Sequence, residues 1–304
     1  SGLIKRLIGI DSAFSLRLLA LVRRRISYRD VILCSNDNLG IILIVASMIL
    51  GKNLEVYVLA MGGISARLRP RVAKWRKIVL KAVLSRCASV IAIGEPEFHL
   101  LHAHLADEVN VAYIPFGVDS RFWAKQVLKV ERDIDVLFVG NDARRDFDVV
   151  VQLVAQLKRN RITLISENQR LVELRDIPNV EVIDGSWGSA VLSDRDLRAA
   201  YCRAKIVIVP VLTDSIQPSG QSVCLQALHC GCFVVMNDFA GIWSKKLLSK
   251  SSRFILGSGD WASDVLDLLH NYCEVSQIPN FVPKEFTDEY FASEFRKRFI
   301  SYEK

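Results

Sequence analysis

The sequence lacks the features that mark several special classes of protein. Its seven cysteines form no Cys-x-x-Cys pair, and the Cys230–Cys232 spacing is too tight for an ordinary zinc site. The longest apolar run, residues 40–50, is too short to span a bilayer, and no signal peptide is recognisable. Scattered cysteines of this kind are typical of reduced thiols, so we expect a cytoplasmic protein.

The composition describes a globular chain with a basic surface. The 304 residues are 51% hydrophobic, which is ample for two packed domains of about 150 residues each. The net charge of +7 favours anionic partners such as phosphates, acidic lipids or nucleic acid. The sequence contains no nucleic-acid-binding motif and no basic strand interleaved with aromatics, so we expect no nucleic acid partner.

Short apolar runs alternate with helical segments along the chain. Continuous apolar strands separated by helices are typical of parallel sheets covered on both faces. A polar, charged stretch at 124–133 divides the pattern into two halves. Strands are predicted at 30–35, 54–59, 89–93, 110–114, 135–139, 162–165, 180–183, 206–211, 233–236 and 253–256. Helices are predicted at 3–25, 39–50, 64–88, 97–105, 146–159, 194–204, 220–230, 261–271 and 286–302.

This alternation predicts an α/β protein with two Rossmann-like domains whose parallel sheets face a central cleft. The predicted domains are residues 1–123 and 124–285. A C-terminal helix within 286–304 is expected to pack back across the domain junction.

The segment 217–238 reads as a loop, a helix and a strand in quick succession. A helix that begins at the carboxyl edge of a parallel sheet offers free N–H groups and partial positive charge to an anion. Ser219, Gln221 and Ser222 add hydroxyl and amide groups suited to a phosphate or a ribose. The segment therefore favours a nucleotide-diphosphate site; the alternative is an ordinary α/β turn with a serine N-cap.

Three segments carry a family resemblance. Residues 113–123, YIPFGVDSRFW, resemble the IPxGVDxxxF segment that joins the domains of GT-B glycosyltransferases. Residues 219–235, SGQSVCLQALHCGCFVV, resemble the donor-site segment of retaining family 4 glycosyltransferases, and 138–147, FVGNDARRDF, resemble the first loop of that family's C-terminal domain. The resemblance covers about residues 30–271. The family's paired glutamates are absent, and Gln226 stands where the second one is expected.

The resemblance implies a GT-B glycosyltransferase. Such an enzyme would move a sugar, with retention, from a UDP-sugar to a glycan or polyprenyl-diphosphate-linked acceptor in polysaccharide biosynthesis. No cofactor is implied beyond the nucleotide sugar itself. Two alternatives stay open: a catalytically inactive nucleotide-sugar-binding protein, which the missing glutamates suggest, and a nucleotide-sugar epimerase of the same fold.

The donor site is expected in the second domain. The diphosphate leaving group gains charge, and because no DxD-like pair of carboxylates is expected in the cleft, we expect basic side chains and a helix N-terminus, rather than a metal, to stabilise it. Glu167 and Trp187 are candidates to flank the base and ribose, and the amide of Gln226 to bind ribose hydroxyls. The predicted donor-binding residues are Gly140, Asn141, Arg144, Arg145, Glu167, Trp187, Ser219, Gly220, Gln221, Ser222 and Gln226.

The acceptor site is expected in the first domain. Asp37, Gly62, Gly63 and Glu95 each follow a predicted strand, and therefore lie at one edge of the sheet. Asp37 and Glu95 are the candidate catalytic carboxylates, able to deprotonate or orient an acceptor hydroxyl. Gly62 and Gly63 are the candidate acceptor-binding residues. The alternative for each carboxylate is a turn cap.

The predicted helix 64–88 is strongly basic. Its cations suit an anionic membrane surface or a diphosphate-linked lipid, which would place the protein peripherally at the inner membrane face. The alternative is a solvated basic face. His99, His102 and His104 share one segment with no evident further ligand, so no metal site is predicted. The residues expected to face the membrane are Arg67, Arg69, Arg71, Lys74, Lys77 and Lys81.

Overall fold

The computed structural model describes residues 30–124, 130–186 and 192–300, with residues 20, 23, 26 and 27 before them. The predicted helix 3–25, apart from two of those positions, and Trp187 lie outside this part of the chain. Internal contacts divide the protein into two units, Ser1–Pro115 with Ile216–Pro218, and Phe116–Ser215 with Ser219–Lys304. Each unit is built on one parallel sheet.

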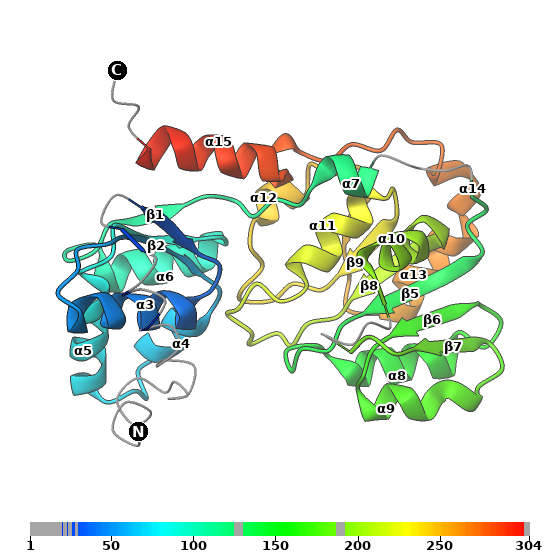
Figure 1. Ribbon diagram of the computed structural model, residues 1–304. Helices are drawn as coiled ribbons and strands as arrows, with labels where there is room; N and C mark the ends of the chain where they lie inside the picture. Colours follow the sequence, from blue (N-terminus) through cyan, green and yellow to red (C-terminus); the bar gives the residue numbers. More distant parts are fainter. Residues whose placement is uncertain are drawn as a thin grey trace. The chain divides into compact units, whose positions relative to one another are not determined.

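The first unit carries a sheet whose strand order, β1-β2-β3-β4, follows the chain, and every neighbouring pair is parallel (Figure 1). The predicted strands of this half are confirmed to within about two residues at either end. The elements are β1 (Val31–Cys34), α3 (Asp37–Ile49), β2 (Glu55–Ala60), α4 (Gly63–Leu68), α5 (Lys74–Leu84), β3 (Ser89–Ala92), α6 (Glu95–Leu105) and β4 (Val111–Tyr113).

The core of the first unit forms between one face of the sheet and the helices. Alternate residues of β2, namely Val56, Val58 and Ala60, are buried in one cluster with side chains of α3, α4, α5 and α6. This is the period of two expected for a strand. The Asn36 side chain caps α3 by accepting from the N–H of Leu39 at 2.9 Å. Packing of these helices brings the loops after β1, β2 and β3 together at one edge.

The structure divides the predicted basic helix 64–88 into α4 and α5. Helix α4 ends at Leu68, Arg69 is extended with φ −55° and ψ 152°, and Pro70 follows. A residue before proline is driven out of the α-region by the ring, and proline itself has no N–H for the helix ladder. The prediction of one continuous helix is therefore wrong, and Arg69 and Arg71 lie in the turn between the two helices.

The second unit carries a doubly wound sheet with strand order β10-β9-β8-β5-β6-β7, all parallel. Its first strand in the chain, β5, lies between β6 and β8, so the winding reverses there. The strands are β5 (Ile134–Val139), β6 (Ile162–Ile165), β7 (Val180–Ile183), β8 (Ala204–Val209), β9 (Phe233–Met236) and β10 (Phe254–Leu256).

Helices flank both faces of this sheet, with α8 and α9 on one side and α10 and α11 on the other (Figure 1). They are α7 (Ser120–Ala124), α8 (Phe147–Gln156), α9 (Gln169–Val172), α10 (Asp194–Arg203), α11 (Gln221–His229), α12 (Lys245–Leu248), α13 (Trp261–His270), α14 (Tyr272–Val275) and α15 (Asp288–Phe299), with 3₁₀ turns at Glu173–Asp176 and Lys284–Phe286.

Successive residues of the central strands enter opposite cores. In β8, Ile206 and Ile208 pack with the α8 side, whereas Val207 and Val209 pack with α10 and α11. All four are essentially buried, which explains why the strand is a continuous apolar run rather than an alternating one. The predicted parallel α/β architecture is confirmed, and none of the described helices is long and apolar enough to cross a membrane.

Candidate functional site

A cavity of about 320 Å³ opens at the carboxyl edge of the second sheet, next to the point where the winding reverses. Open α/β sheets bind ligands at this position because the loops on either side diverge there. The walls come from the loops after β5, β7 and β8 and from the first turns of α10 and α11. The lining residues are Val139, Gly140, Asn141, Asp142, Arg145, Ile165, Gly185, Ser186, Leu192, Ser193, Asp194, Leu197, Gly220, Ser222 and Val223.

Arg145 supplies the positive charge of this cavity. Its side chain is only 3% exposed, and its Nε lies 3.2 Å from a carboxylate oxygen of Asp142. Neither Nε nor Nη1 has a hydrogen-bond partner among the described residues. Burial lowers the pKa of the guanidinium from its usual value. A buried cation with unused donors is costly, so this site favours an anion that can satisfy them.

The backbone around Arg145 is held against the segment that follows β8. Asp146 N–H donates to Pro210 O at 3.1 Å, and Leu212 N–H donates to Arg144 O at 2.9 Å. These bonds aim Arg145 inward, while the side chain of Arg144 is half-exposed and does not line the cavity. The two predicted arginines therefore lie in different environments.

The N-terminus of α11 faces the same cavity. Gly220 is the N-cap residue, with φ +79°, and Ser222 lies in the first turn. A Cβ built at position 220 would overlap both the Arg145 guanidinium and Val209, so only glycine lets the helix start approach the cation. The free N–H groups of this helix start and the guanidinium are the donor types that bind phosphates.

Asn141 fixes the loops around the cavity. Its Nδ2 donates to Gly185 O at 2.7 Å, and its Oδ1 accepts from Ser166 Oγ at 3.0 Å and from the N–H of Glu167 at 2.8 Å. One amide thus connects the loops after β5, β6 and β7. The side chain of Glu167 is exposed and is not part of the lining.

The remaining predicted donor residues lie beside the cavity rather than in its wall. Ser219 donates to both carboxylate oxygens of Asp142 at 3.0 Å. Gln221 is buried at the start of α11, and the amide oxygen of Gln226 accepts from the Tyr201 hydroxyl at 3.4 Å. The structure therefore gathers Gly140, Asn141, Arg145, Gly220 and Ser222 in one wall.

Sequence reasoning missed Asp142 as a site residue. It stands between the glycine and the arginines of the loop after β5, where the family resemblance implies that glycine and basic residues meet the diphosphate. The sequence did contain a sign of it, namely an acidic residue inside a loop predicted to bind an anion. The role of Asp142 depends on its contacts with Arg145 and Ser219, which only the folded chain shows.

Of the candidate residues of the first unit, Asp37 and the two glycines meet around the turn before α4. Asp37 accepts from the N–H groups of Met61, Gly63 and Ile64, at 2.9, 3.2 and 2.9 Å. Glu95 is the first residue of α6 and is half-buried. Glu97 reaches the turn from α6, and sequence reasoning did not single it out.

Glu97 is a buried acid at the turn before α4. It is 1% exposed, and its Oε1 accepts from Gly62 N–H at 2.8 Å and from the Ser65 hydroxyl at 2.5 Å. Its Oε2 is buried with no partner in the described chain. Burial raises the pKa of this carboxyl to about 7, with a smaller contribution from nearby Asp37.

No model of a known protein family matches the chain, and no curated protein matches its sequence. Several solved structures, however, are similar to the chain. Sucrose-phosphate synthase from Thermosynechococcus elongatus is similar with a TM-score of 0.63 at 16% identity, over 93% of this chain and 76% of that one. TarM is similar with a TM-score of 0.64 at 12% identity, over 93% of this chain and 58% of TarM.

HepE of Anabaena, in complex with UDP and glucose, is similar with a TM-score of 0.60 at 12% identity, over 90% of this chain and 75% of that one. Likeness at such low identity shows the fold. The chain has the GT-B fold, with two α/β units on parallel sheets, as its sequence motifs predicted.

Proposed function

We propose that the protein is a glycosyltransferase whose nucleotide-sugar donor binds in the cavity of the second unit. The observation that carries the proposal is the buried guanidinium of Arg145, with unused donors, beside the glycine-led N-terminus of α11. The fold supports it, since HepE, of the same fold, was solved with UDP and glucose.

The chemistry asks the site to stabilise a departing diphosphate. Arg145 and the first N–H groups of α11 would take the growing negative charge, and their fixed positions mean that little reorganisation is needed during the reaction. Leu192 and Leu197 line the cavity and would provide apolar walls for the base. We propose a UDP-sugar as donor, a glycan or lipid-linked acceptor, transfer with retention as in family 4, and catalysis without a metal ion.

The test compares two neighbouring arginines. Arg145→Ala should weaken UDP binding at least tenfold, since a charge-assisted contact contributes about 1.5–3 kcal/mol. Arg144→Ala is the matched control, with the same chemistry removed one residue away, and should bind nearly as the parent does. Calorimetry measures both affinities. If the two variants bind UDP equally well, the donor does not bind in this cavity.

Turnover assays across UDP- and GDP-sugars separate the functional alternatives. A glycosyltransferase should release nucleoside diphosphate, slowly by hydrolysis and faster with an acceptor. An epimerase should change the donor sugar without any acceptor. Binding with neither reaction would identify an inactive nucleotide-sugar-binding protein.

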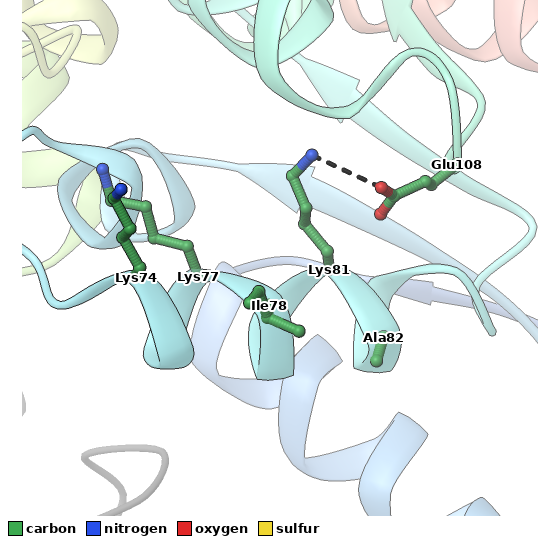
Figure 2. Close-up of a pocket in the computed structure, with 6 residues that line it drawn as sticks. All are labelled: Lys74, Lys77, Ile78, Lys81, Ala82 and Glu108. Carbon is green, nitrogen blue, oxygen red and sulfur yellow. Dashed lines mark hydrogen bonds and ion pairs between the residues drawn. The ribbon is translucent and has the colours of Figure 1, made fainter.

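We further propose that α5 contacts an anionic membrane surface. Figure 2 shows Lys74, Lys77 and Lys81 along one side of the helix, beside Ile78 and Ala82, around a groove of about 460 Å³. Lys81 pairs with Glu108 at 3.4 Å, whereas Lys74 and Lys77 make no ion pair with the described residues. Exposed apolar side chains between cations suit a bilayer interface better than a nucleic acid backbone.

The apolar part of this surface is substantial. Ile78 is 65% exposed and Trp75 is 48% exposed. The residues predicted to face the membrane do not all lie on this helix, since Pro70 separates α4 from α5. In α4, Arg67 donates to Gly63 O at 2.9 Å and to Asn38 Oδ1 at 2.7 Å within the protein. The proposed contact therefore rests on α5 and not on α4.

Sedimentation with vesicles tests this contact. The parent should bind vesicles containing anionic lipid and not purely zwitterionic ones. Lys74→Glu/Lys77→Glu should reduce binding at least tenfold, whereas Lys158→Glu/Lys250→Glu, an equal charge change on exposed lysines of the second unit, should not. If both double variants lose vesicle binding equally, binding depends on the net charge of the protein and not on α5.

A further inference from the structure

We infer that Asp142 is a built-in competitor for the phosphate subsite, so that a diphosphate binds by displacing its carboxylate from Arg145 and Ser219. The inference rests on the proposed function, in that the ligand of the cavity is a nucleoside diphosphate. It adds a residue that limits affinity and favours release of the nucleotide product.

The Asp142 carboxylate is surrounded by donors of the kinds that recognise phosphate. A backbone N–H reaches it from Arg144 at 2.9 Å, the Ser219 hydroxyl lies 3.0 Å from each oxygen, and Arg145 Nε lies 3.2 Å from Oδ2. Backbone amides, hydroxyls and guanidinium groups are also the usual phosphate ligands. The carboxylate therefore lies among the donors that a diphosphate would use, bonded to Ser219 and to the Arg144 N–H and paired in charge with Arg145, whose Nε and Nη1 form no hydrogen bond with the described residues.

The two charged partners differ sharply in exposure. The Arg145 side chain is 3% exposed and held between Gly140 and Gly220, whereas the Asp142 side chain is 47% exposed. Arg145 is packed closely against both glycines, whereas Asp142 can turn into solvent and regain hydration. Displacement of the acid, and not of the base, is therefore the low-cost rearrangement when an anion enters.

This arrangement also changes the charge that a ligand meets. With Asp142 in place, the Arg145–Asp142 pair has no net charge, and a diphosphate beside an undisplaced carboxylate would be repelled. A ligand must offer further contacts to the cavity to compensate for removing Asp142. The acid should consequently weaken the binding of any diphosphate, and a nucleoside diphosphate should bind appreciably because its further contacts offset this cost.

The experiment measures UDP and inorganic diphosphate binding by calorimetry for the parent, Asp142→Asn and Asp142→Glu. Asp142→Asn keeps the size and a hydrogen-bond acceptor for Ser219 but removes the charge, and should tighten UDP binding about tenfold. Inorganic diphosphate should gain by a similar factor. Asp142→Glu keeps the charge and should bind about as weakly as the parent. Asp148→Asn, which removes an exposed acid a few residues away, controls for net charge.

A purely structural role for Asp142 predicts the opposite order, with Asp142→Asn weakening binding and Asp142→Glu weakening it too. That result, or unchanged affinity in Asp142→Asn while the parent binds UDP, would overturn the inference and leave the proposed function standing. If neither the parent nor any variant binds UDP or diphosphate, the proposed function fails and the inference fails with it. Melting temperatures of all variants identify any loss of affinity caused by unfolding.

Discussion

Asp37 and Glu97, from the first turns of α3 and α6, together hold four consecutive backbone N–H groups. Asp37 accepts from Met61, Gly63 and Ile64, and Glu97 accepts from Gly62 between them. A glycine-rich turn at a helix start normally offers these groups to an external anion. Here two side chains of the protein already satisfy them, and the turn, with Gly62 at φ +89°, is fixed by carboxylates.

The buried Glu97 should make folding stability depend on pH. Its pKa is raised from 4.5 to about 7, so the carboxyl favours the folded state while protonated. The favourable contribution is complete below pH 4.5 and is lost as the pH rises through about 7. Glu97→Gln mimics the protonated carboxyl, and should therefore be more stable than the parent at pH 8 by about 3 kcal/mol and similar to it at pH 4.5.

Urea unfolding of both proteins at several pH values measures this difference. Taking the difference between variant and parent cancels other titrating groups, such as buried His229, whose pKa is lowered by burial. Asp107→Asn, which removes an exposed acid just after α6, is the control for loss of a charge in the same unit. If the free energy of unfolding changes with pH in the same way for Glu97→Gln and the parent, Glu97 is ionised in the folded protein at neutral pH and the prediction is wrong.

Gly220→Ala should abolish tight binding of UDP. The new Cβ would meet the Arg145 guanidinium and Val209, and alanine at φ +79° is itself strained by about 1–2 kcal/mol. We expect at least a tenfold loss of affinity and a lower melting temperature.

Gly51→Ala separates the two effects. Gly51 also has positive φ, at +62°, but a Cβ there has no neighbour within 4 Å. This variant should lose stability by backbone strain alone and keep its affinity for UDP. If Gly220→Ala behaves as Gly51→Ala does, the close approach of α11 to Arg145 has no part in ligand binding.

Turnover of the nucleotide sugar should continue in excess chelator. The proposed site supplies positive charge through Arg145 and the start of α11, which do the work that a divalent cation does elsewhere. An assay with and without EDTA measures this, with a metal-dependent glycosyltransferase as the positive control for chelation. Loss of activity that manganese restores would contradict the prediction.

Local patterns in the sequence were sufficient to predict most of the fold. The strands 162–165, 180–183 and 233–236 have the bounds predicted for them, because short β-branched runs between turn residues have few other ways to be buried. The end of α4 before Pro70 could also have been predicted from the local sequence. It was not, because the basic residues on both sides of the proline favoured one continuous helix.

Which polar groups act together was decided by the tertiary structure. Arg144 and Arg145 are neighbours in sequence and chemically identical, and only the bonds between their loop and residues 210–212 turn Arg145 into the cavity. Glu97 is an ordinary helix acid until packing of α4 against α6 removes it from water. Periodicity and turn chemistry depend on residues a few positions apart, so a sequence displays them. Burial, charge pairing and pKa depend on groups distant along the chain, whose positions exist only once it has folded.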